Sequence, residues 1–449
     1  MRSAFVRRVL YPLQQTLQGR NFLGLLEEWS EIQYRPPDEL RERQEEKLRS
    51  LFLHARRHVP HYAEKCRFLG LGPDDIRGLD DLPKLPVLSR EDVRSNFPLR
   101  ITADNVPRRR RVPDRTSGST GEPLIFYRDK AARDAALASF LLFDAWAGIR
   151  PGDRSVHVGA PQPFKLNSKL SAVLRGHTDL GVFSLDDGNT EALLAKLVKI
   201  KPDLIEGYAS VLFRVALAAL KRDVRPKPRA VIATSDTLPA HEPVEDAFGC
   251  RVFNRYGNRE ICGALAQNCP DGRGLHINTE LCVLEVVDEH NLPVPAGRSG
   301  RVLVTDLANR VMPLIRYDTG DRAAAGGTCS CGRGFPLVSA VEGRSTEFLI
   351  SPRGGRVSPV SLGHFLFVSR PYAGSVRVFQ AEQRDAERVV FRFVPMGRAS
   401  ESLKQDLLRD LQEFMGRDVE VRIEFVGDIP AGPGGKRSVI VSSIAPRFP

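Results

Sequence analysis

The segment TSGSTGEP, residues 116–123, contains the residue types best suited to hold a phosphate group. Ser117, Gly118, Ser119, Thr120 and Gly121 combine a flexible backbone with short hydroxyl groups, so N–H and O–H donors can surround phosphate oxygens. It is not a Walker loop, because no Gly-Lys-Ser/Thr ends it. The residues alone leave two interpretations open, a phosphate-binding loop of another kind or a polar surface turn.

Four later segments each combine a turn with a charged side chain. They are NRYGNRE (254–260), PLIRYDTGD (313–321), EGR (342–344) and PAGPGGKR (430–437). The first three end on Glu260, Asp321 and Arg344, and the fourth presents Lys436 in a glycine-rich loop. Taken singly, such segments are more often surface turns than sites.

Together and in this order, the five segments resemble the adenylate-forming superfamily of acyl-CoA synthetases. Within it they look like the branch of phenylacetate–CoA ligases and of proteins associated with capsular polysaccharide biosynthesis. The resemblance implies ATP- and Mg²⁺-dependent activation of a carboxylic acid as acyl-AMP with release of pyrophosphate, then acyl transfer, by default to CoA. Transfer to an amine or a carrier-protein thiol stays open, as does a non-catalytic binding protein in polysaccharide biosynthesis. The sequence does not name the acid.

The resemblance also implies roles for individual residues, in a reaction that depends on positioning and electrostatic stabilisation. Glu260 would help to bind Mg²⁺, Asp321 the ribose, and Arg344 the ribose and phosphates, while Lys436 would bridge the carboxylate and the α-phosphate. The nucleotide and acyl sites would use Ser117, Gly118, Ser119, Thr120 and Gly121 for phosphates, and Ser235, Asp236, Tyr256 and Gly257 around the adenine and the acyl group. The family has an acid two residues after the hinge arginine, whereas this chain has Thr346 there and Glu347 next, so the pivot residue stays open.

A second set of residues has the chemistry of a metal centre. Cys269, His276, Cys329 and Cys331 form C-x6-H and C-x-C patterns, and thiolates with an imidazole suit tetrahedral, structural Zn²⁺. Spacing alone favours buried cysteines and a surface histidine instead. The sequence CSCGR with the upstream Cys and His resembles a metal-binding insertion of this branch, which favours zinc. Cys262 is an alternative ligand to Cys269.

Net charge and composition limit the kinds of ligand and the cellular compartment that can be expected. The chain has 449 residues and a net charge of +11, which favours anionic ligands, and it has no nucleic-acid-binding motif. Seven cysteines, odd in number and unevenly placed, argue against a secreted disulfide framework and predict a cytoplasmic protein. No acidic residue precedes Glu27, so the basic N-terminus is interpreted as a helix docked on its own domain, as a weak membrane-surface contact or as an organelle presequence. A homodimer is also considered.

Hydrophobic periodicity supplies the elements that must position these residues. Helices are expected at 37–59, 129–147, 189–200 and 210–221, and strands at 155–159, 204–208, 230–234 and 252–256, an alternation typical of a parallel sheet. Strands at 281–288 and 300–306 predict antiparallel pairing. The expected fold class is α/β: a large N-terminal domain (1–343) with mixed and parallel sheets and a β-barrel-like subdomain, then a small α+β C-terminal domain (344–449) that carries the lysine. The resemblance implies that the N-terminal domain is the adenylation domain and that the C-terminal domain is mobile.

Overall fold

The computed structural model describes residues 5–430 and 438–444, without 116–123, 160–175, 182–186, 236–237, 239, 262, 345–348, 351–355, 358–361, 364, 367–369 and 371. Several predicted site residues lie outside this part of the chain: Ser117, Gly118, Ser119, Thr120, Gly121, Asp236, Cys262 and Lys436. The chain forms two compact units, unit 1 (Met1–Gly152 and Arg255–Val341) and unit 2 (Asp153–Asn254 and Glu342–Pro449).

The helices of unit 1 bury one apolar face each. In α4 (Pro37–His58), the residues Leu40, Leu48, Leu51 and Ala55 recur at helical spacing and are at most 1% exposed. Acidic residues in its first turn and basic ones in its last turn complement the helix dipole. The other helices are η1 (Val6–Leu10), α2 (Tyr11–Gln18), α3 (Phe22–Ile32), α5 (Pro60–Leu69), α6 (Arg90–Asn96) and α7 (Lys130–Trp146), with 3₁₀ turns at Leu79–Lys84 and Arg108–Arg110.

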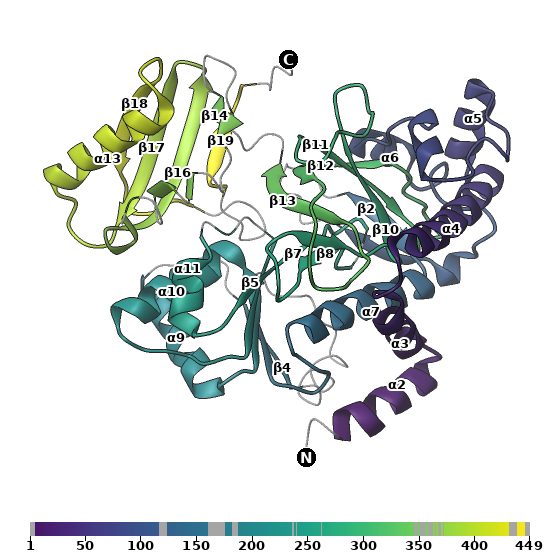
Figure 1. The fold of residues 1–449 in the computed structure, drawn as a ribbon, viewed down its shortest axis with the longest axis horizontal. Helices are drawn as coiled ribbons and strands as arrows, with labels where there is room; N and C mark the ends of the chain where they lie inside the picture. Colours follow the sequence, from purple (N-terminus) through teal and green to yellow (C-terminus); the bar gives the residue numbers. More distant parts are fainter. Residues whose placement is uncertain are drawn as a thin grey trace. The chain divides into compact units, whose positions relative to one another are not determined.

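The main sheet of unit 1 has the strand order β10-β11-β12-β13-β9-β8-β7 (Figure 1). Its strands are β7 (Val252–Tyr256), β8 (Ala266–Asn268), β9 (Leu275–Ile277), β10 (Cys282–Val287), β11 (Ser299–Asp306), β12 (Tyr317–Ala325) and β13 (Leu337–Arg344). β10–β11, β11–β12, β13–β9, β7–β8 and β8–β9 pair antiparallel. A separate antiparallel hairpin is formed by β1 (Val112–Arg115) and β2 (Ile125–Arg128).

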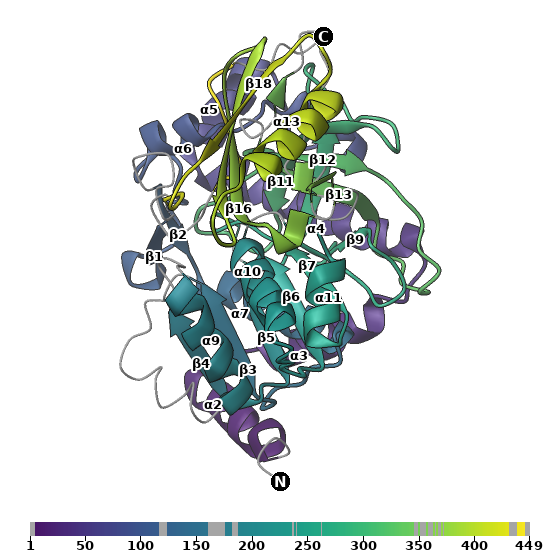
Figure 2. The same cartoon turned by 90° about the vertical axis from the view of Figure 1, so that its left-hand side faces the viewer.

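Unit 2 contains a parallel sheet in which the first residues of β7 pair with β6, followed by β5, β3 and β4. These strands are β3 (Ser155–Gly159), β4 (His177–Gly181), β5 (Leu204–Tyr208) and β6 (Ala230–Thr234). Residues 230–233 are at most 2% exposed, so both faces of β6 are covered. The helices α9 (Asp187–Ile200), α10 (Ala209–Lys221) and α11 (Glu242–Phe248) lie on one face of this sheet (Figure 2).

The C-terminal segment of unit 2 has a four-stranded sheet in the order β18-β17-β16-β19, with a short hairpin before it. Its elements are β14 (Leu349–Ile350), β15 (Arg356–Val357), β16 (Val376–Asp385), β17 (Arg388–Pro395), α13 (Glu401–Met415), β18 (Glu420–Phe425) and β19 (Ile440–Ser442), with a 3₁₀ turn at Tyr372–Gly374. α13 begins where the Ser400 hydroxyl accepts a hydrogen bond from the Leu403 N–H, and it buries Leu407 and Leu411.

The predicted α/β class is confirmed, because parallel strands alternating with helices, antiparallel strands and a C-terminal α+β segment occur in the predicted order. α3 and α5 were not predicted from the sequence. The division into domains 1–343 and 344–449 stays a prediction, while the compact units group 342–449 with 153–254. Among the described helices, none is long and apolar enough to cross a membrane.

Candidate active site and metal centre

Strand β12 positions most of the described site residues of unit 1. Leu88, two residues before α6, is hydrogen-bonded to the beginning of β12. The Leu88 N–H donates to the Arg316 carbonyl (3.0 Å), and the Asp318 N–H donates to the Leu88 carbonyl (3.0 Å). The pairing of β12 with β11 shifts register between Asp318 and Arg322, and Gly320, with φ +74°, lies in this bulge just before Asp321. The start of helix α6 therefore lies beside the RYDTGD segment.

Glu260, the predicted Mg²⁺ ligand, is held by two donors. Its Oε1 accepts hydrogen bonds from the Arg90 guanidinium (3.0 Å) and from the Tyr317 hydroxyl (3.1 Å). Among the described residues, none donates to Oε2. Glu260 is 9% exposed, so the arginine compensates a largely buried carboxylate and one oxygen is left for a further ligand.

Asp321, the predicted ribose ligand, is hydrogen-bonded to Tyr256, which was predicted to lie near the adenine and the acyl group. The Tyr256 hydroxyl donates to Asp321 Oδ2 at 2.7 Å. Burial, and then the charge of Asp321, raise the pKa of Tyr256 well above its ordinary value, so it stays a neutral donor. The neighbouring Thr319 hydroxyl accepts a hydrogen bond from the Asp321 N–H (3.1 Å) and donates one to the Val302 carbonyl (3.0 Å), which fixes the bulge.

The hairpin β1–β2 brings the ends of the TSGSTGEP segment to the residue before Glu260. Residues 116–124 connect the two strands, and Arg115 pairs with Ile125 in their register. The Arg128 side chain donates to Asp114 (2.6 Å) and also to the Arg259 carbonyl. The Arg259 guanidinium donates to the other oxygen of Asp114 (3.2 Å). The flanks of the predicted phosphate loop and the Glu260 turn thus share one ion-pair network.

Position 257 has no room for a side chain, so it needs a glycine. A Cβ atom at this position would lie 2.6 Å from the Gly263 carbonyl oxygen, a contact that the backbone must shift to relieve. The chain can turn tightly between Tyr256 and Glu260 for this reason. Ser235 follows β6 in unit 2, is exposed, and has a left-handed backbone with φ +75°.

The structure thus brings together some of the predicted site residues in unit 1, namely Tyr256, Gly257, Glu260 and Asp321. Arg344 ends β13, and only its backbone is described. Sequence reasoning missed Arg90 and Tyr317. Tyr317 belongs to the RYDTGD segment and was available from it, whereas the only local signal at Arg90 is its place after the helix-capping Ser89.

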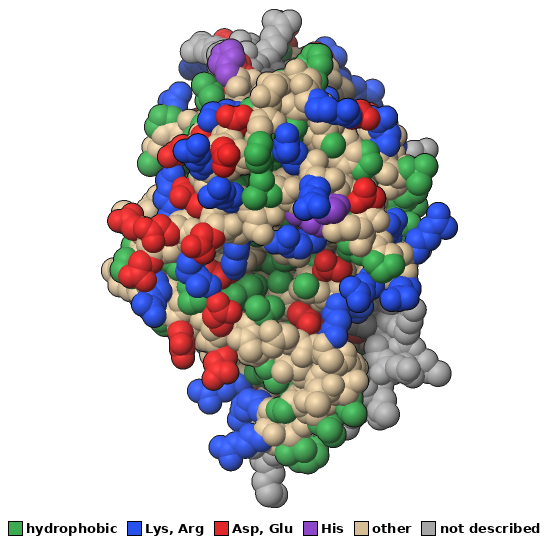
Figure 3. All heavy atoms as spheres, turned by 90° about the vertical axis from the view of Figure 1, so that its right-hand side faces the viewer, with side chains coloured by type: hydrophobic (Ala, Val, Ile, Leu, Met, Phe, Trp, Pro, Cys, Tyr) green, Lys and Arg blue, Asp and Glu red, His purple; other side chains and the backbone are tan. Residues whose placement is uncertain are grey.

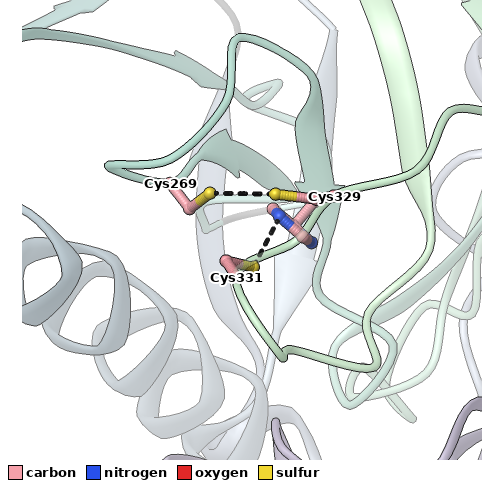
Figure 4. Close-up of side chains that lie close together, drawn as sticks. Cys269, Cys329 and Cys331 are labelled. Carbon is pink, nitrogen blue, oxygen red and sulfur yellow. Dashed lines mark hydrogen bonds between the residues drawn. The ribbon is translucent and has the colours of Figure 1, made fainter.

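The four predicted metal ligands meet at one place in unit 1. Cys269 follows β8 and His276 lies in β9, and these strands form a hairpin, while Cys329 and Cys331 lie between β12 and β13. Their ligand atoms are all within 4.8 Å of one another. The Cys269 Sγ is 3.4 Å from the Cys329 Sγ, and the Cys331 Sγ is 3.4 Å from the His276 Nε2 (Figure 4).

The surroundings of His276 fix its orientation. Its Nδ1 donates to the Phe335 carbonyl (3.0 Å), which leaves the Nε2 lone pair directed at the sulfur atoms. Burial lowers the pKa of His276, so the neutral ring is favoured. The Trp146 ring packs edge-on against it, with centroids 5.5 Å apart, and the Arg333 guanidinium covers Trp146 at 4.5 Å.

The thiols differ in how readily they ionise. Burial raises the pKa of Cys269 to about 11. Burial also raises the pKa of Cys331, but hydrogen bonds from Arg333 and the neighbouring cysteines outweigh it and the net shift is downward. Cys331 therefore supplies a thiolate to a metal ion more readily than Cys269 does.

Comparisons with known proteins agree with this arrangement. Residues 349–443 match the family model described as the CapK C-terminal domain. The chain is 27% identical to phenylacetate-coenzyme A ligase of Thermus thermophilus, over 90% of this chain and 97% of that protein. It is 24% identical to protein CapK of Staphylococcus aureus, over 91% of this chain and 90% of that protein.

Solved structures extend the similarity to the fold. The crystal structure of 2-hydroxyisobutyryl-CoA ligase in the postadenylation state, in complex with R3-HIB-AMP, matches 92% of this chain and 91% of that chain with a TM-score of 0.75 and 19% identity. The anthranilate CoA ligase AuaEII in complex with anthranoyl-AMP matches 75% of this chain and 66% of that chain, with a TM-score of 0.56 and 20% identity. The resemblance predicted from the motifs is confirmed: the chain is similar in sequence to phenylacetate–CoA ligases and has the fold of adenylate-forming CoA ligases.

Proposed function

We propose that this chain is an adenylate-forming ligase, which activates a carboxylic acid with ATP and transfers the acyl group to the thiol of CoA. A carboxylate oxygen of the acid attacks the α-phosphorus of ATP, and the bond to the β-phosphate breaks to release pyrophosphate. The CoA thiol then loses its proton and attacks the acyl carbon, and AMP leaves. The similarity to CoA ligases along nine-tenths of the chain supports this reaction.

One observation carries the proposal: strand β12 connects two carboxylates with separate tasks. Its Tyr317 holds Glu260 (3.1 Å), and its Asp321 is held by Tyr256 (2.7 Å). In the proposed reaction Asp321 accepts hydrogen bonds from the ribose hydroxyls, while Tyr256 keeps its carboxylate oriented. A nucleotide bound by Asp321 would thereby be fixed relative to Glu260 through one short segment of backbone.

The residues around Glu260 fit a magnesium ion. Mg²⁺ prefers hard oxygen ligands and keeps several waters, so one carboxylate oxygen from the protein is a sufficient anchor. Oε1 is engaged by Arg90 and Tyr317, which leaves Oε2 as the ligand atom. When bound, Mg²⁺ would neutralise phosphate charge during the reaction.

The remaining predicted site residues, most of them outside the described part of the chain, would complete the nucleotide site. Ser117, Gly118, Ser119, Thr120 and Gly121 would hold the β- and γ-phosphates, which agrees with the attachment of their flanks beside Arg259. Ser235 and Asp236 would border the adenine, and Arg344 the ribose and phosphates. Lys436 would bridge the acid and the α-phosphate from a C-terminal domain (344–449) that moves between the two half-reactions. ATP and CoA as co-substrates suit a cytoplasmic enzyme.

We further propose that Cys269, His276, Cys329 and Cys331 bind a structural zinc ion. Three sulfurs and one imidazole nitrogen make a complete tetrahedral set, with no position left for a substrate. The Phe335 carbonyl that orients His276 is the kind of outer partner common around zinc. Elemental analysis of protein purified without chelator should find about one zinc per chain, and a zinc-free, fully folded protein would refute the assignment.

Acid-dependent ATP–pyrophosphate exchange tests the activity without knowledge of the acceptor. Across a panel of aromatic, medium-chain and hydroxy acids, at least one acid should support exchange, and CoA with that acid should yield AMP and a thioester. Asp321→Ala should abolish exchange, whereas Asp288→Ala, in an unrelated turn, should not. No exchange with any acid from metal-replete protein would favour the binding-protein alternative. Exchange without thioester formation would favour an amine or a carrier-protein thiol as acceptor.

A further inference from the structure

The first helical segment of unit 1 is docked by one face only. Val6 and Tyr11 are at most 6% exposed and pack in a small apolar cluster with Phe22 and with Leu141 of α7. After this segment, Arg20 forms an ion pair with Asp134 of α7, and the Asn21 N–H donates to the same carboxylate (2.9 Å). The segment is thus fixed on its own unit, as one interpretation of the sequence expected.

The opposite face carries a stripe of large apolar side chains without cover. Phe5, Val9, Leu13 and Leu17 are 56%, 46%, 53% and 77% exposed. They recur every four residues, and four residues of an α-helix advance only about 40° beyond a full turn, so neighbouring members lie almost in line. The wider π turn of η1 at the start counteracts that drift. Exposure of four such residues in a row is unusual for a surface that meets only water.

The charged side chains of the segment itself, residues 5–20, are all arginines. Arg7 and Arg8 flank the stripe, and neither makes an ion pair with a described residue. The first acidic residue of the chain is Glu27, beyond the segment. The lowest part of Figure 3, the end where α2 lies, shows Lys or Arg and hydrophobic side chains on the face turned to the viewer.

We propose that the stripe Phe5–Val9–Leu13–Leu17 docks on an anionic membrane surface, with Arg7 and Arg8 at the lipid headgroups. An apolar face flanked by arginines is the pattern of a helix that lies in the membrane interface. Because the inner face stays on α7, only side chains enter the lipid, and binding is reversible. The ligase would then act at a membrane surface, where its acid or its acyl acceptor is itself lipid-bound. This use of the bound enzyme rests on the proposed function, whereas the docking does not.

The charges favour lipid over a second copy of the chain. If two copies joined through this stripe about a twofold axis, Arg7 and Arg8 of one copy would approach the same residues of its partner. No acid within residues 5–26 would compensate them, and like charges across an interface oppose association. An anionic bilayer supplies the missing negative charge.

Cosedimentation of the full chain with vesicles tests the proposal. Vesicles of phosphatidylcholine with phosphatidylglycerol should bind the protein, and vesicles of phosphatidylcholine alone should bind it at least about tenfold more weakly. Two double variants, Leu13→Glu with Leu17→Glu and Arg7→Glu with Arg8→Glu, should each lose at least about tenfold in binding. Thermal melting verifies that the variants are folded, independently of whether the ligase proposal holds. ATP–pyrophosphate exchange in solution, which rests on the proposed function, should be unchanged in the same variants.

Matched controls use the same substitutions elsewhere. Leu99→Glu replaces a leucine that is 78% exposed, and Arg108→Glu with Arg109→Glu replaces two exposed arginines; both should bind like the parent protein. Absence of binding to anionic vesicles, or binding that the stripe variants leave unchanged, overturns the proposal. A dimer in light scattering that the Leu13→Glu, Leu17→Glu variant converts to a monomer, without vesicle binding, assigns the stripe to a second copy instead.

Discussion

The hydroxyl of Tyr256 donates a 2.7 Å hydrogen bond to Oδ2 of Asp321, which joins the end of β7 to the bulge in β12. Both residues belong to motifs more than 50 residues apart in the chain, and both were predicted to contact the nucleotide. A hydrogen bond of this kind fixes the direction in which the Asp321 carboxylate faces a ligand. In the proposed function that ligand is the ribose.

Removal of the Tyr256 hydroxyl should weaken ATP binding more than it affects the fold. Tyr256→Phe keeps the buried ring and removes one hydrogen bond to a charged group, so the KM for ATP in pyrophosphate exchange should rise by about fivefold. Tyr372→Phe is a matched control, because the Tyr372 hydroxyl donates a 2.7 Å hydrogen bond to Asp410 in the C-terminal segment. An equal rise in both variants would contradict a role in nucleotide binding.

A double-mutant cycle should reveal the coupling between Arg90 and Glu260. Arg90→Ala leaves the largely buried Glu260 carboxylate with the Tyr317 hydroxyl alone, so the free energy of unfolding should fall by about 1–3 kcal/mol. In the Glu260→Gln background the same change should have a smaller effect, because the neutral amide needs no counter-charge. Chemical denaturation without Mg²⁺ measures the cycle.

The control for this cycle is Arg94→Ala, which breaks an exposed ion pair with Glu91 on the same helix and should change stability by less than about 1 kcal/mol. If Arg90 also orients Glu260 for a cation, Arg90→Ala should raise the Mg²⁺ concentration needed for half-maximal exchange, and Arg90→Lys should restore it in part. If the effects of Arg90→Ala and Glu260→Gln on the free energy of unfolding are additive, the ion pair does not contribute to stability.

Loss of a single cysteine should release the proposed zinc. Cys331→Ser replaces a thiol whose pKa is lowered by hydrogen bonds from Arg333 and the neighbouring cysteines, so zinc content should fall well below one per chain and the melting temperature should drop. Cys250→Ser, at a thiol outside the cluster, should retain both. Zinc content and melting curves are measured on the same samples, and full zinc occupancy in Cys331→Ser would remove Cys331 from the ligand set.

The cluster of three cysteines and His276 shows how much of a site can be predicted from the sequence. The β8–β9 hairpin brings Cys269 close to His276, and a turn between two neighbouring strands makes such proximity predictable. Joining that pair to Cys329 and Cys331 depends on the strand order β13-β9-β8, which no local pattern encodes. The resemblance to a known family, rather than periodicity, supplied that part of the prediction.

Arg90 marks the limit of the same reasoning. Its contact with Glu260 joins residues 170 positions apart, and it arises because Leu88 bonds to the backbone on either side of Tyr317. A serine-capped helix start was visible in the sequence, but its partner strand was not. Four strands of the parallel sheet, β3, β5, β6 and β7, were in contrast predicted with their observed limits, since short apolar runs bounded by turns specify them locally. The edge strand β4 was not predicted.

Asp306 should make stability depend on pH in the direction opposite to a salt-bridged acid. It ends β11 with 1% exposure, and burial raises its pKa to about 7, although its Oδ1 accepts the Ala308 and Asn309 N–H groups. Between the unfolded pKa, near 4, and pH 7 the folded state holds a proton that the unfolded state has lost. Its contribution to stability is therefore present below about pH 4 and is lost as pH rises to 7, by up to about 4 kcal/mol.

Comparison of Asp306→Asn with the parent protein isolates this contribution. The variant should gain stability relative to the parent as pH rises from 5 to 8, as measured by denaturant unfolding. Asp288→Asn is the control, because Asp288 also accepts two backbone N–H groups (2.9 Å each) but is only half-buried. A stability difference between Asp306→Asn and the parent that stays constant with pH would mean that Asp306 does not titrate in this range.

Replacement of Lys436 should separate the two half-reactions. In the proposed mechanism its ammonium bridges the acid and the α-phosphate only while the adenylate forms, because a compact charge on a flexible stem suits a contact that is made and then withdrawn. Lys436→Ala should therefore lower pyrophosphate exchange by at least about a hundredfold and leave thioester formation from preformed acyl-AMP and CoA nearly unchanged. Lys404→Ala, in α13 of the same C-terminal segment, should preserve both rates. An equal loss of both half-reactions in Lys436→Ala would mean that the lysine does not leave after adenylation, and the proposed domain movement would have to be abandoned.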